Sequence, residues 1–274
     1  MAIASADFDY IRKLVLNRSA IVLEPGKEYL VESRMLPLLH SEGLETIQSL
    51  VGQLRMGGSR NGLSDKVVDA LTTNETSFFR DVHPFEALKK HVLPDILEKN
   101  KIKRELNIWC GASSSGQEPF TIAMILKNDF PELNNWKINF MSSDISREML
   151  ARCRTGKYSQ LEVNRGLPAM LLVKFFERVG TDWKVKDDLL KMVQFREINL
   201  SEPFPPIPPV DIMFLRNVLI YFDVEMKKSI LGKIKKVLKP SGYLFLGAAE
   251  TTMNIDPAFE RLPLPQSGCY SLKG

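Results

Sequence analysis

The chain of 274 residues is poor in the residue types that mark disulfide-rich, metal-binding and membrane-spanning proteins. Its three cysteines, Cys110, Cys153 and Cys269, lie far apart in sequence, and none of its three histidines has a metal-ligand spacing such as H-E-x-x-H. These absences argue against a disulfide framework and against a metal site. No apolar run approaches the roughly 18 residues that a membrane span needs, and the first residues lack the basic and apolar regions of a signal peptide. We therefore expect a cytoplasmic protein without membrane insertion.

The net charge of +4 is small and unevenly distributed. Up to Glu75 there are 8 basic and 10 acidic residues, whereas the remainder has 29 basic and 23 acidic residues. This excess is well short of what nucleic-acid-binding proteins carry, so we expect no nucleic acid partner. Either the excess favours an acidic protein partner or it belongs to an ordinary solvated surface.

Apolar periodicity divides the chain into a helical first part and a mixed remainder. Up to about residue 73, apolar residues recur at helical spacing and no strand signal occurs, which predicts a small helical bundle. Beyond residue 104, β-prone runs alternate with amphipathic helices, and the runs lie at 105–110, 137–141, 211–215 and 243–246. Such alternation indicates an α/β fold with a mostly parallel, doubly wound sheet. The segment Phe175–Phe195, with its turn at Gly180, interrupts this rhythm and predicts a hairpin-bearing insertion.

A loop of small residues, from Gly111 to Gly116 (GASSSG), follows the first predicted strand. Ligands of α/β sheets bind beyond the carboxyl ends of the strands. Gln117 and Glu118 stand where a P-loop needs Lys and Ser or Thr, which excludes a nucleoside triphosphate, and the G-x-G-x-x-G dinucleotide fingerprint is missing. Asp144 ends the second predicted strand, where such folds place a ribose-binding acid. The pattern favours a ligand with a ribose and no pyrophosphate, such as S-adenosylmethionine.

Both acids also have a local interpretation. Asp144 could cap the helix that follows it, and Glu118 could stabilise the N-terminus of its own helix through its charge.

Two motifs are more specific than the glycine loop: TTNETSFFRD (72–81) and LRNVLIYFD (215–223), and they occur together with WCGASSSGQEPFTIAM (109–124) and an SSD ending at Asp144. In this order and spacing they resemble the CheR family of chemotaxis receptor methyltransferases over nearly the whole chain. The resemblance implies a Rossmann-like class I methyltransferase domain with an inserted small antiparallel β-subdomain, preceded by a small all-helical N-terminal domain. The implied boundaries are a helical domain at 1–73, a linker carrying the TNETSFFR motif at 74–94, and a methyltransferase domain at 95–274 with its insertion at about 173–197.

The resemblance also implies a cofactor, S-adenosyl-L-methionine, with S-adenosyl-L-homocysteine as product. The residues it implies as cofactor-binding are Asn74, Thr76, Arg80, Gly111, Glu118, Asp144, Asn199, Leu200, Arg216 and Asn217. Arg80 and Tyr221 are implied to be catalytic, holding the acceptor carboxylate. The alternative for Tyr221 is packing at the domain junction, which is also our interpretation of Phe78 and Phe79.

The implied activity is that of a protein-glutamate O-methyltransferase acting on the cytoplasmic helical region of methyl-accepting chemotaxis receptors, and we expect a monomer. A glutamate is already an anion at neutral pH, so no general base is needed. Relatives often carry a row of arginines in the second helix for binding acidic receptor helices, of which Arg34 is the main one left, so we do not expect receptor recognition through this helix. The turn at Gly180–Trp183 is short, so we expect an enzyme that uses no receptor tether. The alternatives are a methyltransferase of the same fold acting on a small molecule or nucleic acid, and a non-catalytic adaptor that binds S-adenosylmethionine.

Overall fold

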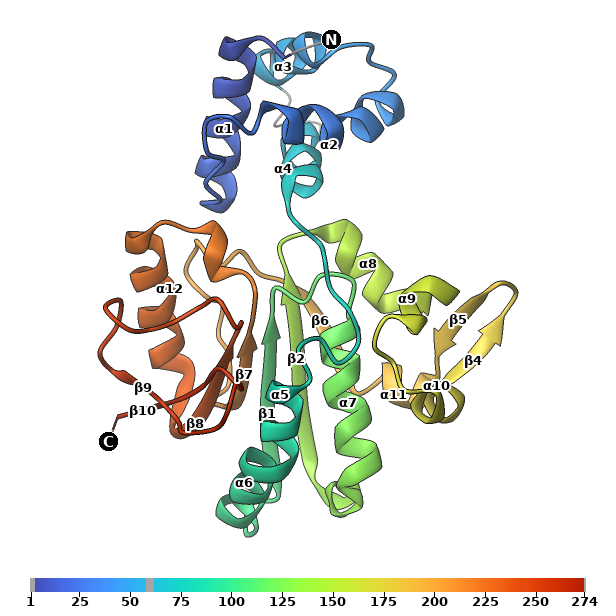
Figure 1. The fold of residues 1–274 in the computed structure, drawn as a ribbon, viewed down its shortest axis with the longest axis vertical. Coiled ribbons are helices and arrows are strands. Elements are labelled where there is room, and N and C mark those ends of the chain that lie inside the picture. The colour runs from blue at the N-terminus through green and yellow to red at the C-terminus, as the bar shows by residue number, and fades with distance from the viewer. Residues whose placement is uncertain (1–2, 58–61, 274) are drawn as a thin grey trace. The chain divides into compact units, whose positions relative to one another are not determined.

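The computed structural model describes residues 3–57 and 62–273, which belong to two compact units (Figure 1). The first unit contains the chain up to Thr73 together with Tyr221–Met226, and the second contains Asn74–Ile220 and the chain from Lys227 onward. No helix in the described ranges is long and apolar enough to cross a membrane.

In its described residues the first unit has four helices around one apolar core: α1 (Ser5–Ser19), α2 (Glu28–Ser41), α3 (Ile47–Arg55) and α4 (Leu63–Leu71). Side chains at helical spacing, such as Ile11 and Val15 on α1 and Val31 and Met35 on α2, are fully buried. The all-helical character expected from the sequence is confirmed. The segment Tyr221–Met226 joins this unit, and the carbonyl of Tyr221 accepts a hydrogen bond from the Val22 amide at 3.0 Å.

Arg34 of α2 serves as a cap for another helix of the same unit. Its guanidinium donates to the carbonyls of Leu71 and Thr72 at 2.8 and 3.1 Å and to Thr73 Oγ1 at 3.0 Å. The last carbonyls of a helix lack partners within the helix, so Arg34 completes the C-terminus of α4. The exposed stripe of α2 is neutral and consists of Tyr29, Ser33, Leu36 and His40.

The second unit contains a seven-stranded sheet in the order β6-β2-β1-β7-β8-β10-β9. Its strands are β1 (Glu105–Gly111), β2 (Lys137–Asp144), β6 (Val193–Glu197), β7 (Val210–Leu215), β8 (Leu238–Leu246), β9 (Phe259–Arg261) and β10 (Cys269–Leu272). The first five are parallel, while β9 and β10 are antiparallel. Gly111 lies opposite both Ser143 and Leu215, so β1, β2 and β7 end together at one edge. The predicted doubly wound sheet is confirmed.

Helices pack against this sheet, and α5, α6 and α7 lie in front of β1 and β2 in Figure 1. The helices are α5 (His83–Ala87), η1 (Leu88–Val92), α6 (Leu93–Asn100), α7 (Gln117–Asp129), η2 (Pro131–Asn135), α8 (Arg147–Thr155), α9 (Gln160–Asn164), α10 (Ala169–Phe175), α11 (Asp187–Leu190), η3 (Leu219–Tyr221) and α12 (Val224–Val237). Phe85 stacks on Phe214 and Phe214 on Phe245, which continues the core from α5 across β7 to β8. Phe78 of the linker is also buried in this core.

The inserted subdomain is a three-stranded antiparallel sheet with the order β3-β5-β4, made of β3 (Lys157–Tyr158), β4 (Phe176–Val179) and β5 (Asp182–Val185). The expected limits of about 173–197 need two corrections. The small sheet takes its first strand from 157–158, and Val193–Glu197 belongs to the large sheet, where it pairs with β2. A two-residue strand shows no periodicity, and alternation alone does not tell which sheet a short strand joins.

Two glycines of this region test how tightly it is packed. Gly166 and Gly180 both have positive φ, at 92° and 63°. A Cβ at Gly166 would overlap the carbonyl oxygen of Phe78, whereas a Cβ at Gly180 would have no atom within 4 Å. Both alanine variants therefore acquire left-handed strain, but only Gly166→Ala also forces two backbone segments apart. We expect urea unfolding to show a loss of about 1 kcal/mol for Gly180→Ala and about 3 kcal/mol for Gly166→Ala. Equal losses would contradict the close packing of Phe78.

Candidate active site

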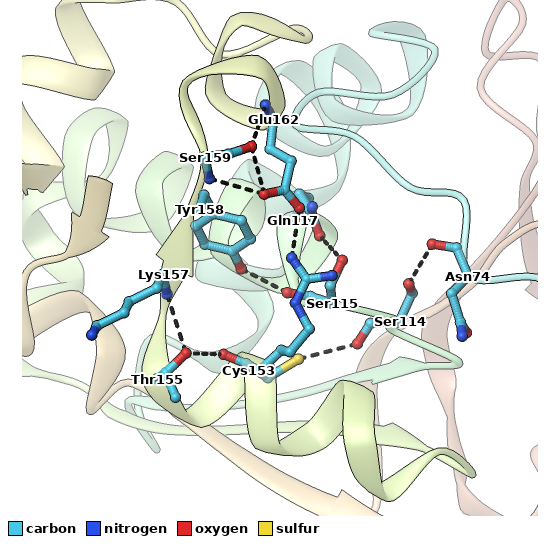
Figure 2. A network of polar contacts seen from close by, with 11 residues as sticks. Asn74, Ser114, Ser115, Gln117, Cys153, Thr155, Lys157, Tyr158, Ser159 and Glu162 are labelled. Atoms are coloured by element: carbon cyan, nitrogen blue, oxygen red, sulfur yellow. Dashed lines mark hydrogen bonds and ion pairs between the residues drawn. The ribbon is translucent and has the colours of Figure 1, made fainter. Parts of the chain in front are cut away.

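The linker motif lies along the glycine loop, although the two are some forty residues apart in sequence. Ser114 Oγ donates to the carbonyl of Asn74 at 2.8 Å (Figure 2). Five residues further on, the Phe79 amide donates to Thr121 Oγ1, on α7, at 3.2 Å. Asn74, Thr76 and Arg80 therefore sit on a segment that is tied at both ends to the loop and to the helix that follows it.

The loop itself holds a strained backbone. Ala112 and Ser114 have φ of 52° and 49°, and Gly116 has φ of 97°. Left-handed conformations cost a non-glycine residue about 1–2 kcal/mol, and they persist where the surroundings over-determine them. Ser114 is fixed in this way, because its amide donates to Asp144 Oδ2 at 2.7 Å and its carbonyl accepts from the Cys153 thiol at 3.1 Å.

Asp144 connects the loops at the carboxyl ends of β1 and β2. Its second oxygen accepts from the Ser146 amide at 2.9 Å, and the carboxylate is almost fully buried. Burial raises the pKa of Asp144, and the backbone donors oppose that rise. The cap of α8 is Ser146, whose hydroxyl accepts from the Met149 amide, so the helix-cap interpretation of Asp144 is wrong. Contact of Asp144 with a ribose stays a prediction.

Arg216 follows β7 and is a buried cation with two carboxylate partners. Its guanidinium donates to Glu118 Oε2 and to Asp81 Oδ2, both at 2.6 Å, and lies 5.6 Å from the centre of the Phe85 ring. A third bond, at 3.2 Å, goes to the carbonyl of Arg80. Arg216 thus joins the end of β7, the first turn of α7 and the end of the linker motif. The cofactor contacts expected of Arg216 and Glu118 stay predictions.

Arg80 differs from Arg216 in its partners. Its guanidinium donates to the carbonyl of Glu75 at 2.8 Å, and among the described residues it makes no ion pair. Glu75 itself is ion-paired with Arg165, which lowers the pKa of Glu75 through a hydrogen bond and charge attraction. The charge of Arg80 also attracts the Glu75 carboxylate and contributes to the lowered pKa of Glu75, but Arg80 forms no ion pair among the described residues.

The other expected residues lie at neighbouring strand ends. Asn199 and Leu200 follow β6, and Asn199 Oδ1 accepts from the Ser201 amide at 3.0 Å. Leu200 is buried, and its carbonyl accepts from Lys233 of α12. Asn217 follows Arg216 with φ of 59°. Tyr221 belongs to the first unit, so its contact with an acceptor held by Arg80 stays a prediction.

Sequence reasoning missed Glu250, which fixes the loop after β7. One carboxylate oxygen accepts from the amides of Val218 and Leu219 at 2.8 and 2.7 Å, and the other accepts from Asn217 and Gly247 at 2.8 and 2.6 Å. Glu250 thus holds the backbone that leads from Arg216 to Tyr221. No local motif marks it, and the only available signal was an acidic residue shortly after the end of β8.

The residues at this edge fit a nucleoside cofactor. Ser113 Oγ in the loop is buried without a hydrogen-bond partner among the described residues, and carboxylates stand after both β1 and β2. At Gly111 a Cβ would lie 2.9 Å from Leu215 Cδ1, so any side chain there would displace the end of the leucine. Hydroxyl groups of a ribose suit these acceptors, whereas a triphosphate would be repelled by Glu118.

Fold and sequence together define the class of the protein. Residues 74–267 match the family model described as CheR methyltransferase, SAM binding domain, and residues 6–72 match CheR methyltransferase, all-alpha domain. The protein is an S-adenosylmethionine-dependent methyltransferase, and the chain belongs to the CheR family.

Curated relatives match over the full length. The chain is 38% identical to Chemotaxis protein methyltransferase 1 of Pseudomonas aeruginosa and 37% identical to Chemotaxis protein methyltransferase Cher2 of Pseudomonas putida, in each case over 100% of both chains. It is also 38% identical to a Chemotaxis protein methyltransferase of Vibrio parahaemolyticus, over 99% of both chains.

Glu250→Gln tests how strongly the stability of the loop after β7 depends on one carboxylate. The amide keeps one acceptor oxygen, but its NH₂ group faces backbone donors and leaves at least two of them unpaired. We expect a loss of about 2–4 kcal/mol in the free energy of unfolding. Glu98→Gln, which removes an exposed pair with Lys101, is the control and should change stability by less than about 0.5 kcal/mol. Similar small effects in both variants would contradict the role of Glu250.

Proposed function

We propose that this protein transfers the methyl group of S-adenosyl-L-methionine to glutamate side chains of methyl-accepting chemotaxis receptors. The products are glutamyl methyl esters and S-adenosyl-L-homocysteine, and the reaction serves adaptation in bacterial chemotaxis. The names of the full-length relatives support the pathway. The contrast between Arg80 and Arg216 supports an anionic acceptor. Arg216 is neutralised by two carboxylates and orients the backbone of Arg80, whose own guanidinium makes no ion pair among the described residues.

Methyl transfer requires the protein mainly to position the acceptor carboxylate against the methyl group of the cofactor. The cofactor supplies a methyl group made electrophilic by its sulfonium. A glutamate is an anion at neutral pH and attacks without a general base. The residues of the chain must bring the carboxylate into line at roughly 3–3.5 Å and exclude water. Arg80 can hold one oxygen through its forked donors, and Tyr221 can donate a second hydrogen bond, while the other oxygen attacks.

The cofactor belongs at the carboxyl edge of the sheet in this proposal. Glu118 and Asp144 face the ribose, Asn199 and Leu200 flank the adenine, and Gly111 lets the ligand approach the backbone. The remaining cofactor-binding residues are Asn74, Thr76, Arg80, Arg216 and Asn217. Their positions on the linker and at the ends of β1, β2, β6 and β7 support this assignment.

Receptor recognition should depend little on charge at α2. Arg34 is occupied by the carbonyls at the end of α4, and the exposed stripe of the helix is neutral. The turn between β4 and β5 comprises only Gly180 and Thr181. We propose a monomeric enzyme that binds the cytoplasmic helical region of the receptor without a tether.

Arg80→Ala tests whether Arg80 binds the acceptor carboxylate. The variant loses a charge-assisted fork, and kcat/KM with receptor fragments should fall by at least about a hundredfold. Arg165→Ala, which removes the neighbouring cation paired with Glu75, is the matched control and should retain most of the activity. Labelled cofactor and filter counting measure both. Unimpaired turnover by Arg80→Ala would refute its role.

The class of acceptor can be determined with the same labelled cofactor. Receptor fragments, RNA and small carboxylic acids are offered in parallel. We expect label on the receptor fragment alone, released as methanol at alkaline pH because a carboxyl ester is base-labile. Label on RNA or on a small acid would instead assign the enzyme to a different substrate class, and no turnover with any acceptor would favour a cofactor-binding adaptor.

A further inference from the structure

The glycine loop has two further supports, one from the inserted subdomain and one from α8. Tyr158 of β3 is buried, and its hydroxyl donates to the carbonyl of Ser115 at 2.7 Å (Figure 2). One residue earlier in the loop, the thiol of Cys153, at the end of α8, donates to the carbonyl of Ser114 at 3.1 Å. Two successive carbonyls of the loop are therefore held by side chains rather than by backbone amides.

Gly116 shows how closely these two side chains approach the loop. A Cβ built there would lie 3.0 Å from both Cys153 Sγ and the Tyr158 hydroxyl oxygen. The two donors thus meet the loop at its last turn before α7, where only glycine leaves room for them.

The ring of Tyr158 is fixed independently of its hydroxyl. It packs edge-to-face on Phe78 with centroids 5.1 Å apart, and it also contacts Phe120 and Phe176. Because β3 pairs with β5 through Tyr158 and Trp183, the small sheet determines where this ring lies. Removal of the hydroxyl alone leaves this packing in place.

We propose that Tyr158 and Cys153 are positioning residues for the cofactor loop, so that the inserted three-stranded sheet helps to set the affinity for S-adenosylmethionine. The inference rests on the proposed placement of the cofactor at this loop. The carbonyl of Ser115 faces Tyr158 of the subdomain and the carbonyl of Ser114 faces Cys153 of α8, so the two donors fix the orientation of two successive peptide groups of the loop. Without the two donors, the strained loop relaxes and must be reordered when the cofactor binds.

Calorimetry with S-adenosylhomocysteine on the full chain tests the proposal. Tyr158→Phe should bind about tenfold more weakly, because the Ser115 carbonyl loses its partner. Tyr243→Phe, which removes a 2.7 Å bond to Asp95 elsewhere in the same unit, is the matched control and should bind like the parent chain. Cys153→Ala should weaken binding similarly, and Cys153→Ser, which keeps a donor, should restore it.

Two further readouts separate positioning from general destabilisation. Amide hydrogen exchange at residues 112–116 should accelerate in Tyr158→Phe without cofactor, and the KM for S-adenosylmethionine should rise while the KM for the receptor stays constant. Affinity within twofold of the parent chain for both Tyr158→Phe and Cys153→Ala would overturn the inference. Asp144→Ala distinguishes this failure from that of the proposed function: if it also binds normally, the cofactor does not lie at this loop.

Discussion

The buried guanidinium of Arg216 is the interaction on which the rest of the site depends. A cation without water is costly, and the cost is offset only if carboxylates and hydrogen bonds replace its solvent shell. Glu118 and Asp81 supply both at 2.6 Å, and the face of Phe85 covers the plane of the group. Because the two carboxylates come from α7 and from the linker, the ion pairs of Arg216 join β7, α7 and the linker in one arrangement. The position of the Arg80 backbone follows from it.

The loops around this pair are preorganised by buried carboxylates that accept backbone amides. Asp144 fixes the loop after β1, and Glu250 fixes the loop after β7. Backbone amides that would otherwise bind a ligand or water donate to these carboxylates instead. The strained residues Ser114 and Asn217 are thereby held at positive φ. A loop ordered before binding loses less conformational entropy when the cofactor arrives. The positions of these loops are therefore established during folding, before the cofactor binds.

The sequence predicts those parts of the structure that depend on local pattern. The helical first unit, the buried strands at β1, β2 and β7 and the glycine loop follow from periodicity and composition, and the motifs identify the family. The origin of β3 and the sheet to which β6 belongs could not be predicted, because short strands carry no partner signal. Glu250 was missed for a related reason: most of its amide partners belong to the loop after β7, 30 to 33 residues away, and only the tertiary fold makes its carboxylate buried. Tyr158 likewise acts through one hydroxyl whose acceptor is 43 residues distant.

Arg216, which follows β7, and Arg80, in the linker, differ in their ion pairs, and the proposed mechanism gives them different roles. Arg216 forms ion pairs with two carboxylates through its two terminal nitrogens, whereas Arg80 donates to a carbonyl and makes no ion pair among the described residues. If Arg80 and Arg216 were both unpaired, an incoming glutamate would bind at either arginine, and the in-line geometry would be lost. Had both been neutralised, nothing would compensate the acceptor when it leaves water. In the proposed mechanism, Arg216 contributes to specificity indirectly, because its ion pairs leave Arg80 to bind the acceptor carboxylate.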